Sequence, residues 1–155
     1  MKNADVQAGP IVVIKDVPFP ELPSPNHLII RCVVSGSNPK DWAIAERSLC
    51  TPSGLVMIIW LTCAVPGSTQ GDDIAGVVHS VGTNVTNFKP GDRVAAFHEM
   101  ITPNGAFGEY GVAPENTTMH LPPDVSFEEA ATIPLAAMTA ALGLYQRLKL
   151  PLPCE

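Results

Sequence analysis

Two neighbouring segments decide the fold of this chain: Gly71-Asp72-Asp73-Ile74-Ala75-Gly76-Val77-Val78 and Phe88-Lys89-Pro90-Gly91-Asp92-Arg93-Val94. The first opens an apolar run that predicts a strand over residues 75–81, and the second leads into a strand over residues 94–97. Proline and glycine occupy the two central positions of the tetrapeptide 89–92. This order is typical of a type II turn, because proline fixes a negative φ and glycine permits a positive one.

Four further segments predict strands, and these cover residues 11–16, 28–34, 106–112 and 117–121. Residues 28–34 are almost continuously apolar, which is typical of a strand buried on both faces. Six short strands separated by turn signals, in a chain with 16 prolines and 12 glycines, predict a compact β-barrel. We therefore expect a mainly β fold with some helix.

The last third of the chain changes to helical patterns. Ser126 and Glu129 form the S-x-x-E signature of a capping box, which predicts a short helix. A longer helix is predicted from Pro134 to Leu148, with its apolar face made of Leu135, Met138, Leu142 and Tyr145. A short helix is also expected over residues 40–47, with Pro39 at its first position.

The composition limits the classes of partner. The 155 residues include 9 Lys and Arg against 15 Asp and Glu, which gives a net charge of -6. No basic run is present, so a nucleic-acid partner is not expected. The four cysteines (Cys32, Cys50, Cys63 and Cys154) form no metal-binding spacing, and we expect free thiols in a reducing compartment.

Residues 55–65 form an apolar run of a different kind. They show neither strand alternation nor a helical stripe, and 11 residues are too few to span a bilayer, which needs about 20. The N-terminus has no apolar signal-like stretch, so we expect a cytoplasmic protein without a membrane partner. One interpretation of the run is a buried strand, and the other is an anomalous insert over residues 49–68.

Four motifs, in order, resemble those of the medium-chain dehydrogenase/reductase superfamily: residues 37–42 (SNPKDW), 71–77 (GDDIAGV), 89–94 (KPGDRV) and 128–135 (EEAATIPL). The resemblance covers nearly the whole chain except about residues 48–69. The chain is similar in particular to the zinc-independent quinone and enoyl reductase branch, and within that branch to fungal reductases that act beside polyketide synthases.

This resemblance implies a GroES-like β-barrel over residues 1–133 and, over residues 134–155, the start of the helix that leads into a nucleotide-binding domain. In the family a Rossmann domain follows and holds NADP(H). No glycine-rich phosphate-binding loop precedes Glu155. We therefore expect the Rossmann domain to be absent from this polypeptide.

The resemblance also bears on metal binding. Zinc-dependent members of the superfamily place a cysteine where Asn38 stands and a histidine where Asp72 stands. Asparagine is a poor zinc ligand, and no Cys/His pair replaces these positions, so we expect no zinc. His98 and Glu99 are another pair of possible metal ligands, and we interpret them as a solvated turn.

Without a metal, the resemblance implies hydride transfer from the nicotinamide to an activated double bond. The candidate catalytic residues are Asn38, as a donor to a carbonyl or to the cofactor amide, and Lys40, as an acid or a phosphate contact. The candidate cofactor-binding residues are Asn38 and Thr139. Each also has a structural alternative: Asn38 shaping the loop before Pro39, Lys40 as a solvated lysine, and Thr139 bonding back to its own helix.

The expected function is therefore that of the substrate domain of a zinc-independent NADPH-dependent oxidoreductase acting on a small enoyl or quinone-like substrate. The alternative is a truncated, non-catalytic GroES-like module or a mis-spliced product, with residues 49–68 as a translated intron. A homo-oligomer and a polyketide synthase partner both stay open. Taken alone, the chain is expected to be inactive.

Overall fold

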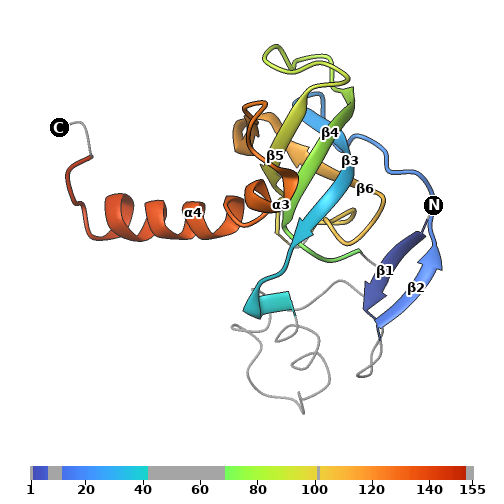
Figure 1. Cartoon of the computed structure of the whole chain (residues 1–155), viewed down its shortest axis with the longest axis horizontal. Helices are drawn as coiled ribbons and strands as arrows, with labels where there is room; N and C mark the ends of the chain where they lie inside the picture. The colour runs from blue at the N-terminus through green and yellow to red at the C-terminus, as the bar shows by residue number, and fades with distance from the viewer. Residues whose placement is uncertain (1, 7–11, 42–68, 101, 153–155) are drawn as a thin grey trace.

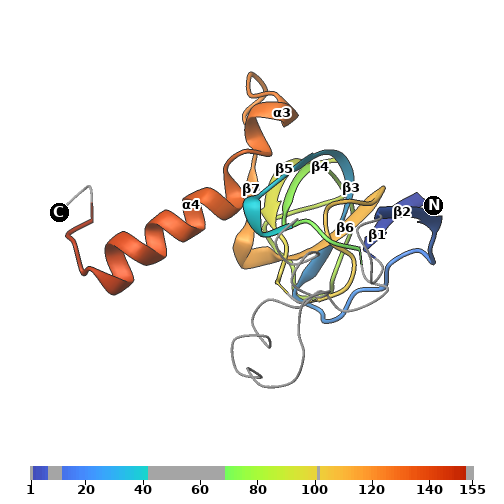
Figure 2. The ribbon, with the colours of Figure 1, turned by 90° about the horizontal axis from the view of Figure 1, so that it is seen from below.

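The computed structural model describes residues 2–6, 12–41, 69–100 and 102–152. Seven strands in these residues form a two-stranded sheet, β1-β2, and a five-stranded antiparallel sheet of order β6-β3-β4-β5-β7. The strands are β1 (Lys2–Val6), β2 (Val12–Asp16), β3 (His27–Gly36), β4 (Asp73–Val81), β5 (Arg93–Phe97), β6 (Tyr110–Pro114) and β7 (Thr118–His120). The larger sheet curls strongly, as Figures 1 and 2 show.

The predicted fold class is confirmed: the chain is mainly β, and its curled sheet matches the GroES-like domain. Five of the six predicted strands overlap an observed strand along most of their length. β1 was not predicted. The interpretations of residues 49–68, and of the helix beyond residue 41, fall outside the described residues.

The tight turn before β5 forms as predicted. The backbone N–H of Asp92 donates to the carbonyl oxygen of Lys89 at 3.2 Å, and Gly91 has φ +95°. The Asp92 carboxylate also accepts a hydrogen bond from the Lys89 N–H at 3.0 Å. This turn sets how β5 enters the sheet beside β4.

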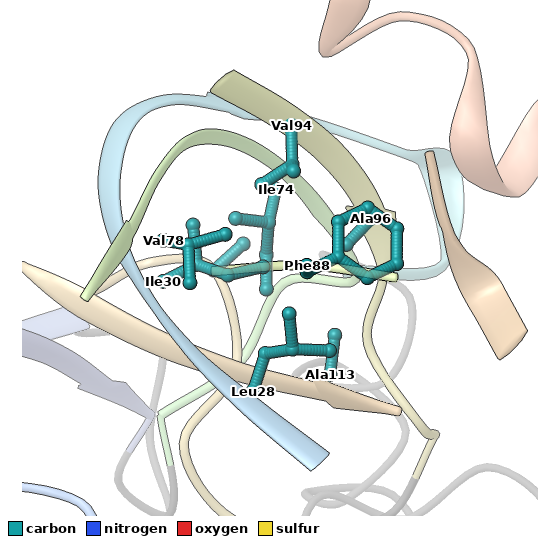
Figure 3. Close-up of a cluster of buried hydrophobic side chains, with 9 residues drawn as sticks. Leu28, Ile30, Ile74, Val78, Phe88, Val94, Ala96 and Ala113 are labelled. Atoms are coloured by element: carbon teal, nitrogen blue, oxygen red, sulfur yellow. The ribbon is translucent and has the colours of Figure 1, made fainter. Parts of the chain in front are cut away.

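The curled sheet closes around one apolar cluster, shown in Figure 3. Large side chains from β3, β4 and β5 fill it: Leu28, Ile30, Ile74, Val78 and Val94, with Phe88 from the preceding loop. On the opposite face of the sheet the residues are small. Ala75 and Ala95 are fully buried there against Ala130 and Ala131. Small side chains on this face let a helix lie close to the sheet.

Two strand predictions need correction. β3 is buried on both faces only over Leu28, Ile29 and Ile30, whereas Val33 further along is 48% exposed. Residues 106–109 do not extend β6, because the backbone N–H of Ala106 donates to the carbonyl oxygen of Gly71. Ala106 and Phe107 pair with the loop before β4, whereas the carbonyl oxygen of Glu109 accepts the Cys32 N–H of β3 at 2.9 Å.

Two helices follow the sheet. α3 (Phe127–Ala130) packs on the small-residue face, and α4 (Pro134–Ala141) continues into a π-helical segment, η2 (Leu142–Arg147). Figures 1 and 2 show the rod of α4 and η2 projecting away from the sheet. Of the predicted apolar face, Leu135, Met138 and Tyr145 are half-buried, whereas the prediction is wrong for Leu142, which is 42% exposed. Apolar and alanine side chains surround this helix on all sides, so their spacing does not mark one face.

Cys32 is the cysteine within the described residues, and it is a free thiol. Burial raises its pKa to about 12, because the charged thiolate is poorly solvated beside the core. The prediction of free thiols is thus confirmed for Cys32, and the other three cysteines lie outside the described residues.

Candidate functional site

The candidate site lies where β3 ends and β4 begins. Gly36 at the end of β3 is the register partner of Asp73 at the start of β4. The chain after β3 passes through Asn38 into a helical turn at residues 39–41. The antiparallel pairing thus brings residues near position 40 to residues near position 72, and two of the family-like motifs meet here.

Asn38 is held by two carboxylates. Its side-chain Nδ2 donates to Asp73 Oδ2 at 2.6 Å, and its backbone N–H donates to Asp41 Oδ2 at 2.8 Å. The Asp41 N–H donates back to the Asn38 carbonyl oxygen at 3.0 Å. These two bonds let Asp41 anchor the helical turn at residues 39–41. Asn38 therefore shapes its loop and also belongs to the polar cluster.

Asp73 connects this cluster to α4. It is 3% exposed, and its Oδ1 accepts a hydrogen bond from the backbone N–H of Leu135 at 2.6 Å. Leu135 is the second residue of α4, whose free N–H groups and dipole favour a negative charge. A buried carboxylate is costly unless its oxygens are hydrogen-bonded, and both oxygens of Asp73 are.

Lys40 is paired rather than freely solvated. Its Nζ forms an ion pair with Asp72 Oδ2 and lies 3.8 Å from Asp41 Oδ1, and its side chain is 26% exposed. Burial raises the pKa of Asp41, and the neighbouring charges of Asp72 and Asp73 act in the same direction. Two carboxylates, Asp72 and Asp41, thus lie beside one ammonium group, and Asp73 joins the same cluster through Asn38.

This charge balance limits which ligand group fits here. The cluster of Asn38, Lys40, Asp41, Asp72 and Asp73, called the Asn38 cluster below, has one positive and three negative side chains. An added phosphate would be repelled, so the expected phosphate contact of Lys40 is disfavoured by the geometry. An uncharged group, such as a carboxamide or a carbonyl, fits the donors and acceptors present.

Thr139 differs from these residues because it is exposed and does not belong to the Asn38 cluster. It is exposed on α4 and does not line the groove of about 320 Å³ that separates this helix from the end of the sheet. The helix residues that line that groove are Pro134, Ala137, Met138 and Ala141. The cofactor role of Thr139 therefore stays a prediction.

His98 is a residue that the sequence interpretation misjudged. It is 3% exposed, so the interpretation of a solvated turn is wrong for it, although the adjoining Glu99 side chain is 61% exposed. Its ring Nδ1 donates to the Val112 carbonyl oxygen at 2.6 Å, and its backbone N–H donates to the Asp72 carbonyl oxygen at 2.7 Å. His98 thus stabilises the loop that carries Asp72, through the hydrogen bond from its backbone N–H.

Two kinds of feature are missing from the described ranges. Among residues 2–6, 12–41, 69–100 and 102–152, no group of three or more His, Cys, Asp or Glu side chains is placed to hold a metal ion. In the same part of the chain, no helix has the length and apolar character needed to cross a bilayer.

Comparisons with known proteins agree with the fold. The model of the alcohol dehydrogenase GroES-like domain matches residues 24–123. A trans-enoyl reductase, fsr4 of Gibberella fujikuroi, is 44% identical over 153 residues, which are 99% of this chain and 41% of that protein.

Two solved structures have the same fold. The quinone oxidoreductase of Coxiella burnetii aligns with a TM-score of 0.74 and 28% identity, over 94% of this chain and 44% of its own. Mycobacterial Rv1454c complexed with NADPH aligns with a TM-score of 0.69 and 28% identity, over 96% of this chain and 42% of its own. The chain spans less than half the length of each of these relatives. It belongs to the alcohol dehydrogenase GroES-like domain family, within the medium-chain dehydrogenase/reductase superfamily.

Proposed function

We propose that this chain is the substrate-side domain of a zinc-independent, NADP(H)-dependent oxidoreductase that reduces the activated double bond of an enoyl or quinone-like substrate. Trans-enoyl and quinone reductases among its relatives support the oxidoreductase class. The NADPH found with one structural relative supports the choice of cofactor. The observation that carries the proposal is the Asn38 cluster, which offers an amide and an ammonium group at the end of the curled sheet.

The same proposal covers the domain organisation. Residues 1–133 form the GroES-like domain, and residues 134–155 begin the helix that leads toward a nucleotide-binding domain, which supplies the rest of the cofactor site. The protein acts in the cytoplasm on small molecules, and the resemblance to reductases that act beside polyketide synthases favours a substrate delivered by such an enzyme.

When bound, a nicotinamide would supply a hydride for the β carbon of the double bond. Negative charge then develops on the substrate carbonyl oxygen, and the α carbon must gain a proton. Lys40 is the donor suited to that oxygen, because Asp72 and Asp41 hold its ammonium group in place. Asn38 is suited to orient an uncharged amide group beside it. The proton for the α carbon comes from Lys40 or from water.

The test is NADPH consumption by the protein that carries this domain together with its nucleotide-binding domain, in the presence of an α,β-unsaturated thioester or a quinone. We expect consumption to depend on substrate and to fall about 10²-fold in Lys40→Met, by analogy with the loss of one oxyanion donor. Lys89→Met is the matched control, since Lys89 is exposed in the turn before β5. Full retention of activity in Lys40→Met would contradict the role of Lys40. Absence of consumption with a folded chain would favour a non-catalytic module.

A further inference from the structure

The direction of the Asn38 side chain is the feature that leads beyond this proposal. An asparagine amide has a donor end and an acceptor end, and the hydrogen-bond network decides which end faces which neighbour. The neighbour of one end is Asp73 Oδ2, at 2.6 Å. A carboxylate only accepts hydrogen bonds, so the nitrogen of Asn38 must face it.

Asp73 itself has little freedom to turn. Its other oxygen accepts the hydrogen bond from the Leu135 N–H at the start of α4. Its Cβ lies so near Gly36 that a methyl group on that glycine would approach to 2.7 Å. The side chain is also 3% exposed. The carboxylate is therefore a fixed acceptor, set by the sheet on one side and by α4 on the other.

The oxygen of Asn38 consequently points away from Asp73. Within the described residues no hydrogen bond reaches this oxygen, and Asn38 is half-buried. We infer that Asp73 is a positioning residue that makes Asn38 a hydrogen-bond acceptor toward the ligand, so that the Asn38 cluster selects a group carrying an N–H or O–H donor. This inference rests on the proposed function, in which the primary carboxamide of the nicotinamide is the donor group that fits. It reverses the expectation that Asn38 donates.

Replacing Asp73 with asparagine should reverse the Asn38 amide. The side-chain oxygen introduced at position 73 would keep the hydrogen bond from Leu135, and the introduced nitrogen would then face Asn38. Asn38 would have to turn its oxygen toward that nitrogen and present its own nitrogen to the ligand. Asp73→Asn would thus exchange an acceptor for a donor on the ligand side of Asn38, with almost no change in volume.

The experiment measures binding of NADPH and of its 3-acetylpyridine analogue, which keeps the carbonyl oxygen but lacks the amide N–H donor. Both ligands are titrated by fluorescence into the protein that carries this domain together with its nucleotide-binding domain, and the Asn38 side-chain amide is followed by NMR. In the unsubstituted protein we expect the analogue to bind about 2- to 10-fold more weakly, the equivalent of one hydrogen bond. One Asn38 amide proton should be shifted strongly downfield before any ligand is added. In Asp73→Asn the discrimination should vanish.

Asp124→Asn is the matched control, because it makes the same chemical change at an exposed turn residue and should leave the discrimination intact. Equal affinity for both ligands in the unsubstituted protein would overturn the inference while leaving NADPH binding, and the proposed function, in place. An Asn38 amide without a downfield proton would overturn it independently of any ligand. Failure of NADPH to bind at all would count against the proposed function and the inference together. The measurements on the unsubstituted protein do not require Asp73→Asn to fold.

Discussion

The two helices that follow the sheet begin in opposite ways. α3 is capped by its own sequence: Ser126 Oγ accepts the Glu129 N–H at 3.1 Å, and Glu129 Oε2 accepts the Ser126 N–H at 3.0 Å. α4 has no side-chain cap at Ile133, and the N–H of Leu135 donates to Asp73, 62 positions earlier in the chain. One start is fixed locally, whereas the other is tied to the Asn38 cluster. The orientations of α4 and of Asn38 are thus coupled through one carboxylate.

The comparison predicts that the distant cap matters most. Asp73→Ala removes the acceptor for both the Leu135 N–H and the Asn38 amide, and we expect a loss of about 3 kcal/mol in the free energy of unfolding. Urea denaturation of the full chain measures it. A loss smaller than that caused by Ser126→Ala would break the comparison, because the local cap would then be the stronger of the two.

A substitution at Gly36 tests how closely β3 approaches the end of α3 and Asp73. A Cβ there would lie 2.2 Å from the Ala131 carbonyl oxygen at the end of α3, so Gly36→Ala should cost about 2 kcal/mol through overpacking. Gly91→Ala is the matched control, with open space around its Cβ but a positive φ of +95°. We expect the control to cost about 1 kcal/mol, from backbone strain alone. Thermal or urea unfolding ranks the pair, and the reverse order would contradict the close approach.

Ser126→Ala should affect α3 alone. Loss of an N-cap hydroxyl costs about 1 kcal/mol, so the free energy of unfolding should fall by that amount. Hydrogen exchange should speed up at the amides of α3, while the amide of Leu135 keeps its protection. Faster exchange at Leu135 in this variant would show that the two helix starts are not independent.

The smallest expected effect is the one that Glu129 and Asp41 have on the pH dependence of the free energy of unfolding. The hydrogen bonds from Ser126 lower the pKa of Glu129, so its contribution to stability is present above the ordinary value of 4.5 and is lost as the pH falls through the lowered one. Burial raises the pKa of Asp41, so ionised Asp41 costs stability above that raised value, and protonation on acidification relieves the cost.

Glu129→Gln should therefore be less stable than the unsubstituted chain near neutral pH, with a difference that shrinks in acid. Asp41→Asn should show the opposite sign over the same pH range. Urea titrations at several pH values compare the two variants. Parallel pH profiles for both would mean that the two carboxyl groups do not differ as described.

The same contrast explains what could be predicted from sequence. The turn at residues 89–92 and the capping box at Ser126 depend on side chains within three residues of each other, and both are observed. The bond from Leu135 to Asp73 depends on the sheet register, which no local pattern contains. For the site, the motifs placed Asn38 and Lys40 near Asp72 and Asp73 through the resemblance, but the direction of the Asn38 amide required the structure. The buried state of His98 was missed because its partner, the Val112 carbonyl, lies on another strand.

The most direct test of the central claim is a fluorescence titration of NADPH into the full chain and into Asn38→Ala. The account predicts saturable binding that weakens when Asn38 loses its amide, because the Asn38 cluster forms the nicotinamide side of the site. NADPH binding that is identical in both proteins would contradict it.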